Sequence, residues 1–165
     1  MTLADLNASD RDGFVAAIGW IFEHSPWAAE RAWLRRPFES LDELHGAMVA
    51  EVSAAHPDEQ LALLRAHPDL GSRAGMTDAS TTEQSGAGLD SLTIDEFERL
   101  HQLNRAYRDK FGFPFLLAVK GTTKHDVLAA LAARLPATPE HELAEALRQV
   151  FRIARFRLQD VVTAS

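Results

Sequence analysis

The chain has 165 residues, 46 % of them hydrophobic, so we expect it to bury about two thirds of its unfolded surface within one domain, residues 1–165. It contains no cysteine, which excludes disulfides, thiolate metal sites and a cysteine nucleophile. A formal net charge of −7 disfavours nucleic acid as a partner, and no apolar run approaches the roughly 18 residues of a membrane span.

Capping residues and apolar periodicity predict helices over 10–24, 27–35, 41–55, 58–66, 94–110, 123–134 and 139–162. Their starts are marked by side chains with capping-box spacing or by a hydroxyl before proline: Ser9 with Asp12, Ser40 with Glu43, Thr93 with Glu96, and Thr138 with Pro139. The one strand-like stretch, 111–121, contains Pro114 and has no partner stretch. The fold class is therefore expected to be all-α, a single-domain helical bundle of about seven or more helices.

The polar segment 76–92 joins two well-patterned regions and is long for a connection in a compact domain, which favours a functional or a mobile segment. Within it, Ser80 and Glu83 have capping-box spacing, so a short helix is expected to start at Ser80. On the sequence alone, a purely capping role for these two residues stays open beside a functional one.

Three histidines, His45, His56 and His67, fall eleven residues apart and would share one face of a continuous helix. Pro57 and Pro68 follow two of them and disfavour helical backbone there, which removes the argument for a metal site. The segment HELAE at 141–145 lacks the second histidine of the zinc motif HExxH. The sequence therefore predicts no catalytic metal.

His-Pro-Asp occurs twice, in AHPDEQLALLRAHPDLG. His56 leads into a polar helix start, with Asp58 available as a cap, which favours a structural role. His67 follows the amphipathic stretch LALLRA, so we expect it at a helix C-terminus, where carbonyl groups favour the protonated imidazole. His67 is the better candidate for catalysis.

Two polar residues interrupt apolar helix faces. Arg157 lies about 20° from Val150, on the face of the last helix formed by Leu143, Leu147, Val150, Ala154, Leu158 and Val161. A buried guanidinium needs an acceptor, so Arg157 either pairs with an internal acid or binds an anionic ligand. Asn104 shares a face with Phe97, Leu100 and Tyr107, and we expect it to satisfy a backbone group in the core.

Taken in order, the motifs SPWAAERAWLRRPF, HPDLG, STTEQSGAGLD, LNRAYRDKFGFPFLLAVKG and FRLQD resemble the OHCU decarboxylase family over about residues 22–160. Members of that family convert 2-oxo-4-hydroxy-4-carboxy-5-ureidoimidazoline to S-allantoin in urate degradation. The resemblance implies an all-helical decarboxylase that needs no cofactor and forms homodimers. Phe156 is a departure, because leucine is expected there.

By position, the resemblance assigns catalysis to His67 and Glu83. It assigns substrate contacts to residues near His67 and in the polar segment, namely Pro68, Ser80, Thr81, Thr82, Glu83 and Gln84. It assigns further contacts to the stretch after FGFP, namely Phe115, Leu116, Leu117, Ala118 and Val119, and to Arg157, the arginine that helical geometry singles out. Relatives from vertebrates and plants are peroxisomal, but this sequence ends in VVTAS, so we expect a cytoplasmic protein.

An alternative is a non-enzymatic helical module that binds a ureide or a partner protein. A paired histidine and glutamate argue for the enzyme instead, since a binding module has no need of them. A metal hydrolase that uses the histidines is a third possibility, which the metal content of the purified protein tests.

Overall fold

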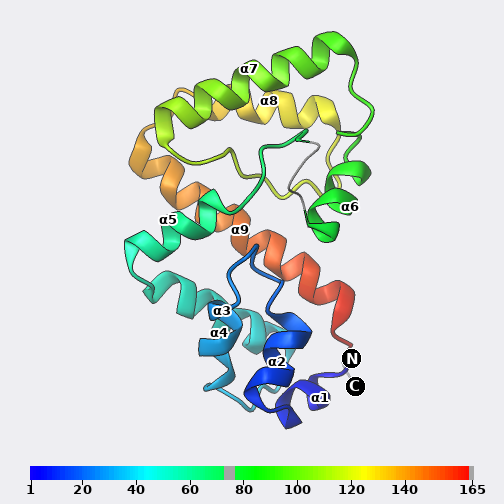
Figure 1. Ribbon diagram of the computed structural model, residues 1–165, viewed down its shortest axis with the longest axis vertical. Coiled ribbons are helices and arrows are strands. Elements are labelled where there is room, and N and C mark those ends of the chain that lie inside the picture. The colour runs from blue at the N-terminus through cyan, green and yellow to red at the C-terminus, as the bar shows by residue number, and fades with distance from the viewer. Residues whose placement is uncertain (73–76, 164–165) are drawn as a thin grey trace. The chain divides into compact units, whose positions relative to one another are not determined.

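The structure is a computed structural model that describes residues 1–72 and 77–163 (Figure 1). Its helices are α1 Leu3–Ala8, α2 Arg11–Ile18, α3 Trp27–Trp33, α4 Leu41–Ala54, α5 Pro57–Arg65, α6 Asp78–Gly86, α7 Ile94–Phe111, α8 Lys124–Arg134 and α9 Pro139–Val161. Within the described ranges there is no strand, only an isolated bridge between Thr2 and Thr163. The all-α prediction is confirmed. Met76, where the predicted polar segment begins, lies outside the described residues.

One compact unit consists of Met1–Ala66 and Phe151–Ser165. In this unit α3 packs against both α2 and α4. The core is formed by large apolar side chains that are 0–1 % exposed: Phe14, Ile18, Phe22, Leu44, Met48, Leu63 and Leu158. The ends of the chain meet here, because the Thr163 amide donates to the Met1 carbonyl at 2.8 Å.

The other compact unit is His67–Val150, in which α7 and α8 lie side by side (Figure 1). Its core surrounds Tyr107, whose ring contacts Phe111, Phe113 and Phe115 at centroid distances of 4.5, 6.0 and 5.4 Å. The predicted capping box of Thr93 and Glu96 starts α7. One domain over 1–165 stays a prediction.

The predicted start of the first helix is wrong. Asp10, rather than Ser9, caps α2, since its carboxylate accepts from the Gly13 amide at 2.8 Å. Ser9 instead follows α1, a short helix that the sequence pattern did not indicate, and its hydroxyl donates to the Asp5 carbonyl at 2.7 Å. The expected helix over 10–24 ends at Ile18, and the chain then turns through His24, whose φ is +46°.

The predicted buried face of α9 is wrong in its first half and confirmed in its second. Leu143 is 38 % exposed, whereas Glu142, Ala146 and Gln149 are buried. The polar side chains can lie inside because each has partners there, as described below. Beyond Val150, Ala154, Arg157 and Leu158 are buried as expected, whereas Val161 is only half-buried. None of the helices described is both long and apolar enough to span a bilayer.

Candidate active site

His67 lies directly after the C-terminus of α5, whose last residue is Arg65 and whose C-cap is Ala66. This position is the one predicted from the sequence. The residue is 7 % exposed, so the second His-Pro-Asp copy has a buried histidine. Pro68 beside it is half-buried.

The residues that follow His67 are held by one face of α7. Three side chains spaced by four residues contact three successive residues of the loop: Arg108 contacts Asp69, Asn104 contacts Leu70, and Leu100 lies against Gly71. The Arg108 guanidinium is 3.0 Å from the Asp69 carboxylate, and the Asn104 amide donates to the Leu70 carbonyl at 2.9 Å. The prediction that Asn104 satisfies a core backbone group is confirmed. This face of α7 fixes the backbone next to His67.

Gly71 is required where it stands. Its φ is +80°, and a Cβ atom there would lie 2.6 Å from Cδ2 of Leu100. The Gly71 amide donates to Oε1 of Gln84 at 2.8 Å, which ties the loop to α6. The side-chain oxygen of Gln84 is therefore engaged within the protein, and its amide nitrogen is the part suited to a ligand acceptor.

The capping alternative for Ser80 and Glu83 is wrong. The hydroxyl of Thr77 caps α6 by accepting from the Ser80 amide at 3.2 Å, so Ser80 and Glu83 lie inside the helix. Ser80 and Gln84 are each 6 % exposed, and Glu83 is half-buried. Thr81 and Thr82 have exposed side chains on the other side of α6. The inward side of this helix thus carries three of its predicted site residues.

The third predicted group is the irregular segment 115–119. Phe115, Leu116, Ala118 and Val119 are 0–6 % exposed, whereas Leu117 is half-buried. Arg134 donates to the Leu116 carbonyl at 2.6 Å, and the Ala118 amide donates to Gln149 at 3.0 Å. Side chains of α8 and α9 therefore hold this backbone.

Arg157 belongs to the unit formed by the two ends of the chain, whereas the other predicted site residues belong to His67–Val150. Its guanidinium donates to the Glu23 carboxylate at 3.0 Å and to the Ile21 carbonyl at 3.1 Å. The two charged side chains are 3 % and 1 % exposed. The internal pair weighed in the sequence is thus present, and a substrate contact by Arg157 stays a prediction.

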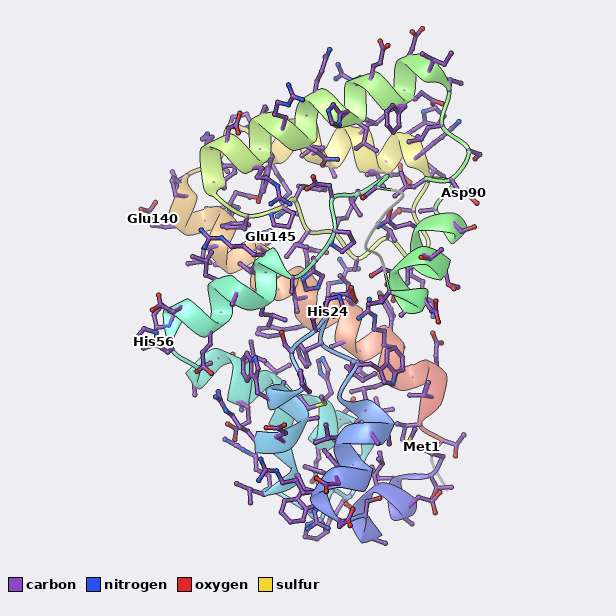
Figure 2. All side chains as sticks on the ribbon, in the orientation of Figure 1. Met1, His24, His56, Asp90, Glu140 and Glu145 are labelled. Atoms are coloured by element: carbon purple, nitrogen blue, oxygen red, sulfur yellow. The ribbon has the colours of Figure 1, made fainter. Side chains whose placement is uncertain are left out.

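The remaining histidines of the eleven-residue series have structural contacts. His56 caps α5, with its ring accepting from the Asp58 amide at 3.1 Å, so the cap is His56 rather than Asp58. Figure 2 shows its side chain projecting from the start of α5. The ring of His45 contacts the Phe151 carbonyl at 2.8 Å. In the described parts of the chain, no three histidine, aspartate or glutamate side chains gather in a way that could hold a metal ion.

Sequence reasoning missed the residues that support the site: Asn104 as a support of the His67 loop, and Arg134, Glu142 and Gln149 as supports of 115–119. A weak signal exists for Glu142 and Gln149, because they are seven residues apart and therefore share one face of a helix. Arg134 gave no signal, since an arginine in the last turn of a helix is ordinary.

Comparison with known proteins agrees with this arrangement. The family model described as OHCU decarboxylase matches residues 7–159. A 2-oxo-4-hydroxy-4-carboxy-5-ureidoimidazoline decarboxylase of Haloferax volcanii is 49 % identical over 160 residues, which cover 97 % of this chain and 95 % of that protein. A bifunctional uric acid degradation protein of Bacillus subtilis is 49 % identical over 98 % of this chain, which spans only 33 % of that longer protein.

Among solved structures, an (S)-allantoin synthase is similar with a TM-score of 0.79 and 39 % identity, covering 98 % of this chain and 54 % of that one. The family model covers most of the chain, and the Haloferax relative matches nearly end to end, so the resemblance inferred from the motifs is confirmed. The chain belongs to the OHCU decarboxylase family.

Proposed function

We propose that this chain is a carboxy-lyase that decarboxylates 2-oxo-4-hydroxy-4-carboxy-5-ureidoimidazoline and releases S-allantoin, a step of urate degradation. The observation that carries the proposal is the family match over 7–159, which includes the HPDLG histidine. The Haloferax relative, which this chain matches over 95 % of that protein's length, bears the name of this reaction. A buried His67, with α6 and α7 holding the loop beside it, agrees with this activity.

The chemistry can proceed on the substrate's own groups. Cleavage of the bond from the ring carbon to the carboxylate releases CO2, and the electron pair of that bond forms a carbon–carbon double bond within the ring. The pair of the adjacent C=N bond moves to nitrogen, which takes up a proton. Loss of the hydroxyl proton and protonation of the neighbouring carbon then give allantoin. The C=N unit is the electron acceptor, so we propose that no cofactor is needed.

His67 is proposed as the general acid/base. Imidazole titrates near neutral pH, so it can accept the hydroxyl proton or deliver a proton to carbon. Delivery to one face of the ring carbon makes the S product. We propose that Glu83 orients His67.

Substrate binding is proposed for the remaining predicted residues. Ser80 and Gln84 lie on the buried side of α6 and suit the ureido group and ring amides. Backbone groups within 115–119 suit the same amides. Arg157 would neutralise the substrate's negative charge. Pro68 would line the site, whereas Thr81 and Thr82 would contribute from exposed positions of α6.

Two finer points stay proposals. We propose a homodimer, as the family resemblance implies, which sedimentation of the purified chain tests. We propose a cytoplasmic location, which cell fractionation tests.

The test of the proposed function follows circular dichroism of allantoin formed from freshly generated substrate. Wild-type protein should give the S enantiomer faster than the spontaneous reaction. His67→Asn should lower the rate by about 10² to 10⁴, the usual effect of removing a general acid/base. His56→Asn is the matched control and should retain activity within a few-fold, because His56 only caps a helix.

Racemic product at the spontaneous rate with wild-type protein would refute the decarboxylase and leave the binding module. Equal losses at both histidines would refute the choice of His67. Stoichiometric metal in active protein would refute the cofactor-free account.

A further inference from the structure

The segment 115–119 is held from one edge by two side chains that the proposed mechanism does not use. Arg134, at the end of α8, donates to the Leu116 carbonyl at 2.6 Å. Gln149, in the first half of α9, accepts from the Ala118 amide at 3.0 Å. The segment is therefore anchored at Leu116 and at Ala118, on either side of Leu117.

Each anchor is fixed in turn by a carboxylate of the segment HELAE. Nε of Arg134 donates to Glu142 at 2.9 Å, and Nε2 of Gln149 donates to Glu145 at 2.9 Å. Figure 2 marks Glu145 on α9. Because Glu142, Glu145 and Gln149 are spaced by three and four residues, they share one face of the helix. The HELAE carboxylates therefore support a backbone segment.

The Arg134 anchor contacts further buried groups. Glu142 is 0 % exposed, and its Oε1 also accepts from the Tyr107 hydroxyl at 2.5 Å. The Arg134 guanidinium lies over the Phe115 ring, 4.5 Å from its centroid. Arg134 thus fixes both the ring of Phe115 and the carbonyl of Leu116.

This anchoring determines which backbone groups are left for a ligand. In an extended chain, the N–H and C=O groups of alternate residues point to the same edge. The Leu116 C=O and the Ala118 N–H are engaged by side chains of α8 and α9, so an extended segment would turn the N–H and C=O of Leu117 to the other edge. Among the residues that the structure describes, neither the N–H nor the C=O of Leu117 has a hydrogen-bond partner. Leu117 is also the only residue of 113–119 that is not fully buried.

We infer that Arg134 and Gln149 are positioning residues, which hold segment 115–119 so that the N–H and C=O of Leu117 receive the amide groups of the substrate. This inference rests on the proposed function. A donor and an acceptor side by side match the C=O and N–H of a cyclic or ureido amide. The pairing specifies a ureide over a hydrocarbon or an ester, which lacks the N–H.

The test removes one anchor and measures ligand binding. Gln149→Leu keeps the size of the side chain and removes the acceptor for the Ala118 amide. We expect KM for the ureidoimidazoline, and the inhibition constant of S-allantoin, to rise about five- to tenfold, since one backbone contact is misplaced. The turnover number kcat should change less than KM, because these contacts form equally in the ground and transition states.

A polarity exchange supplies the rescue. In Glu145→Gln with Gln149→Glu, the amide at 145 can donate to the carboxylate at 149, which still accepts from Ala118. This double variant should recover most of the lost affinity. Arg148→Met is the matched control, because Arg148 pairs with the same Glu145 but is 66 % exposed and does not contact the segment. It should leave KM unchanged.

Arg134→Lys tests the other anchor independently. It keeps the charge beside Glu142 but loses the planar fork that reaches Leu116 and Glu142 together. Its KM should also rise while kcat is largely kept. With an active wild type, unchanged KM and unchanged allantoin inhibition in Gln149→Leu and Arg134→Lys would overturn the inference, even if both variants melt earlier. A wild type that forms no S-allantoin would overturn the proposed function and this inference together.

Discussion

Each of the two compact units contains an arginine that bridges a buried glutamate and a backbone carbonyl. In the unit formed by the chain ends, Arg157 binds Glu23 and the Ile21 carbonyl. In His67–Val150, Arg134 binds Glu142 and the Leu116 carbonyl. The glutamates are 1 % and 0 % exposed, so the two arrangements have the same chemistry.

The two pairs differ in how the arginine is placed. Arg157 lies inside α9, four residues before its end and on an apolar face, whereas Arg134 is the last residue of α8 and its side chain is 15 % exposed. Glu142 also accepts a hydrogen bond from the Tyr107 hydroxyl. Burial of Tyr107, followed by its hydrogen bond to the Glu142 carboxylate, raises the pKa of Tyr107. A family motif includes Arg157 but not Arg134. One buried ion pair is thus a substrate-binding candidate, and the other supports the fold and the backbone of the site.

The largest expected effect is on stability. Arg134→Met should strand the buried Glu142 and lower the free energy of unfolding by about 3 to 5 kcal/mol, visible as a drop in melting temperature without ligand. Arg157→Met should have a similar effect through Glu23. Adding Glu142→Gln to Arg134→Met should recover part of the loss, because the stranded charge is removed. If ligand-free Arg157→Met melts like wild type, the Arg157–Glu23 pair does not stabilise the fold as the Arg134–Glu142 pair does.

The next prediction distinguishes a substrate-binding role of Arg157 from a purely structural one. Arg157→Lys keeps the charge near Glu23 but loses the planar bidentate fork, so turnover should fall tenfold or more if the residue contacts the substrate. A charge-assisted hydrogen bond of roughly 1.5 to 3 kcal/mol accounts for this factor. Thermal melting of the empty protein should change little.

Arg155→Lys is the control for this experiment, because Arg155 lies two residues earlier and pairs with Asp42, which is 72 % exposed. Full activity in Arg157→Lys, beside a strongly destabilised Arg157→Met, would show that the pair with Glu23 is its whole role.

These two arginines also show what a sequence can reveal. Arg157 could be found because helical periodicity places a charge within an apolar stripe, and a motif covers the same position. Arg134 could not, because nothing local distinguishes it and its partners, Glu142 and Leu116, depend on tertiary packing. The same reason hid Glu142 and Gln149, whose burial displaces Leu143 from the core.

Helix starts were predictable where one capping residue stands alone, as at Thr93 and Ser40. The predicted starts were wrong where several neighbouring residues could each act as the cap. Ser9 and Asp10 are adjacent, and Thr77 and Ser80 can both accept from a first-turn amide, so the sequence does not decide between them. The difference matters for the site, because a start at Thr77 turns Ser80 and Gln84 inward on α6.

Replacing Glu83 should lower the turnover rate much more than it lowers the melting temperature. Unlike Glu23 and Glu142, Glu83 is half-buried and lies within α6, so it is neither a core acid nor a cap. Glu83→Gln should lower turnover at least tenfold, about 1.4 kcal/mol of activation free energy, if it orients His67. The melting temperature should fall far less. Near-normal turnover with a large stability loss would place Glu83 beside Glu23 and Glu142 as a structural acid.

The smallest effect is expected for an acid at the surface. Glu96 completes the α7 capping box, and its Oε1 accepts from Lys124 of α8 at 2.8 Å. The hydrogen bond from Lys124, followed by that from the Thr93 amide, lowers the pKa of Glu96 from 4.5 to about 2. Because the folded pKa is depressed, the contribution to stability is present above pH 4.5 and is lost as the pH falls toward 2.

Glu96→Gln should therefore melt slightly below wild type near neutral pH, and the two should converge near pH 2. Glu98→Gln makes the same charge change at an exposed position of α7 and should melt like wild type near neutral pH. The side chains of Glu96 and Lys124 are 18 % and 24 % exposed, against 1 % and 3 % for Glu23 and Arg157, so the surface pair should contribute much less to stability. A difference between Glu96→Gln and wild type that persists unchanged in acid would mean that the amide loses packing rather than charge.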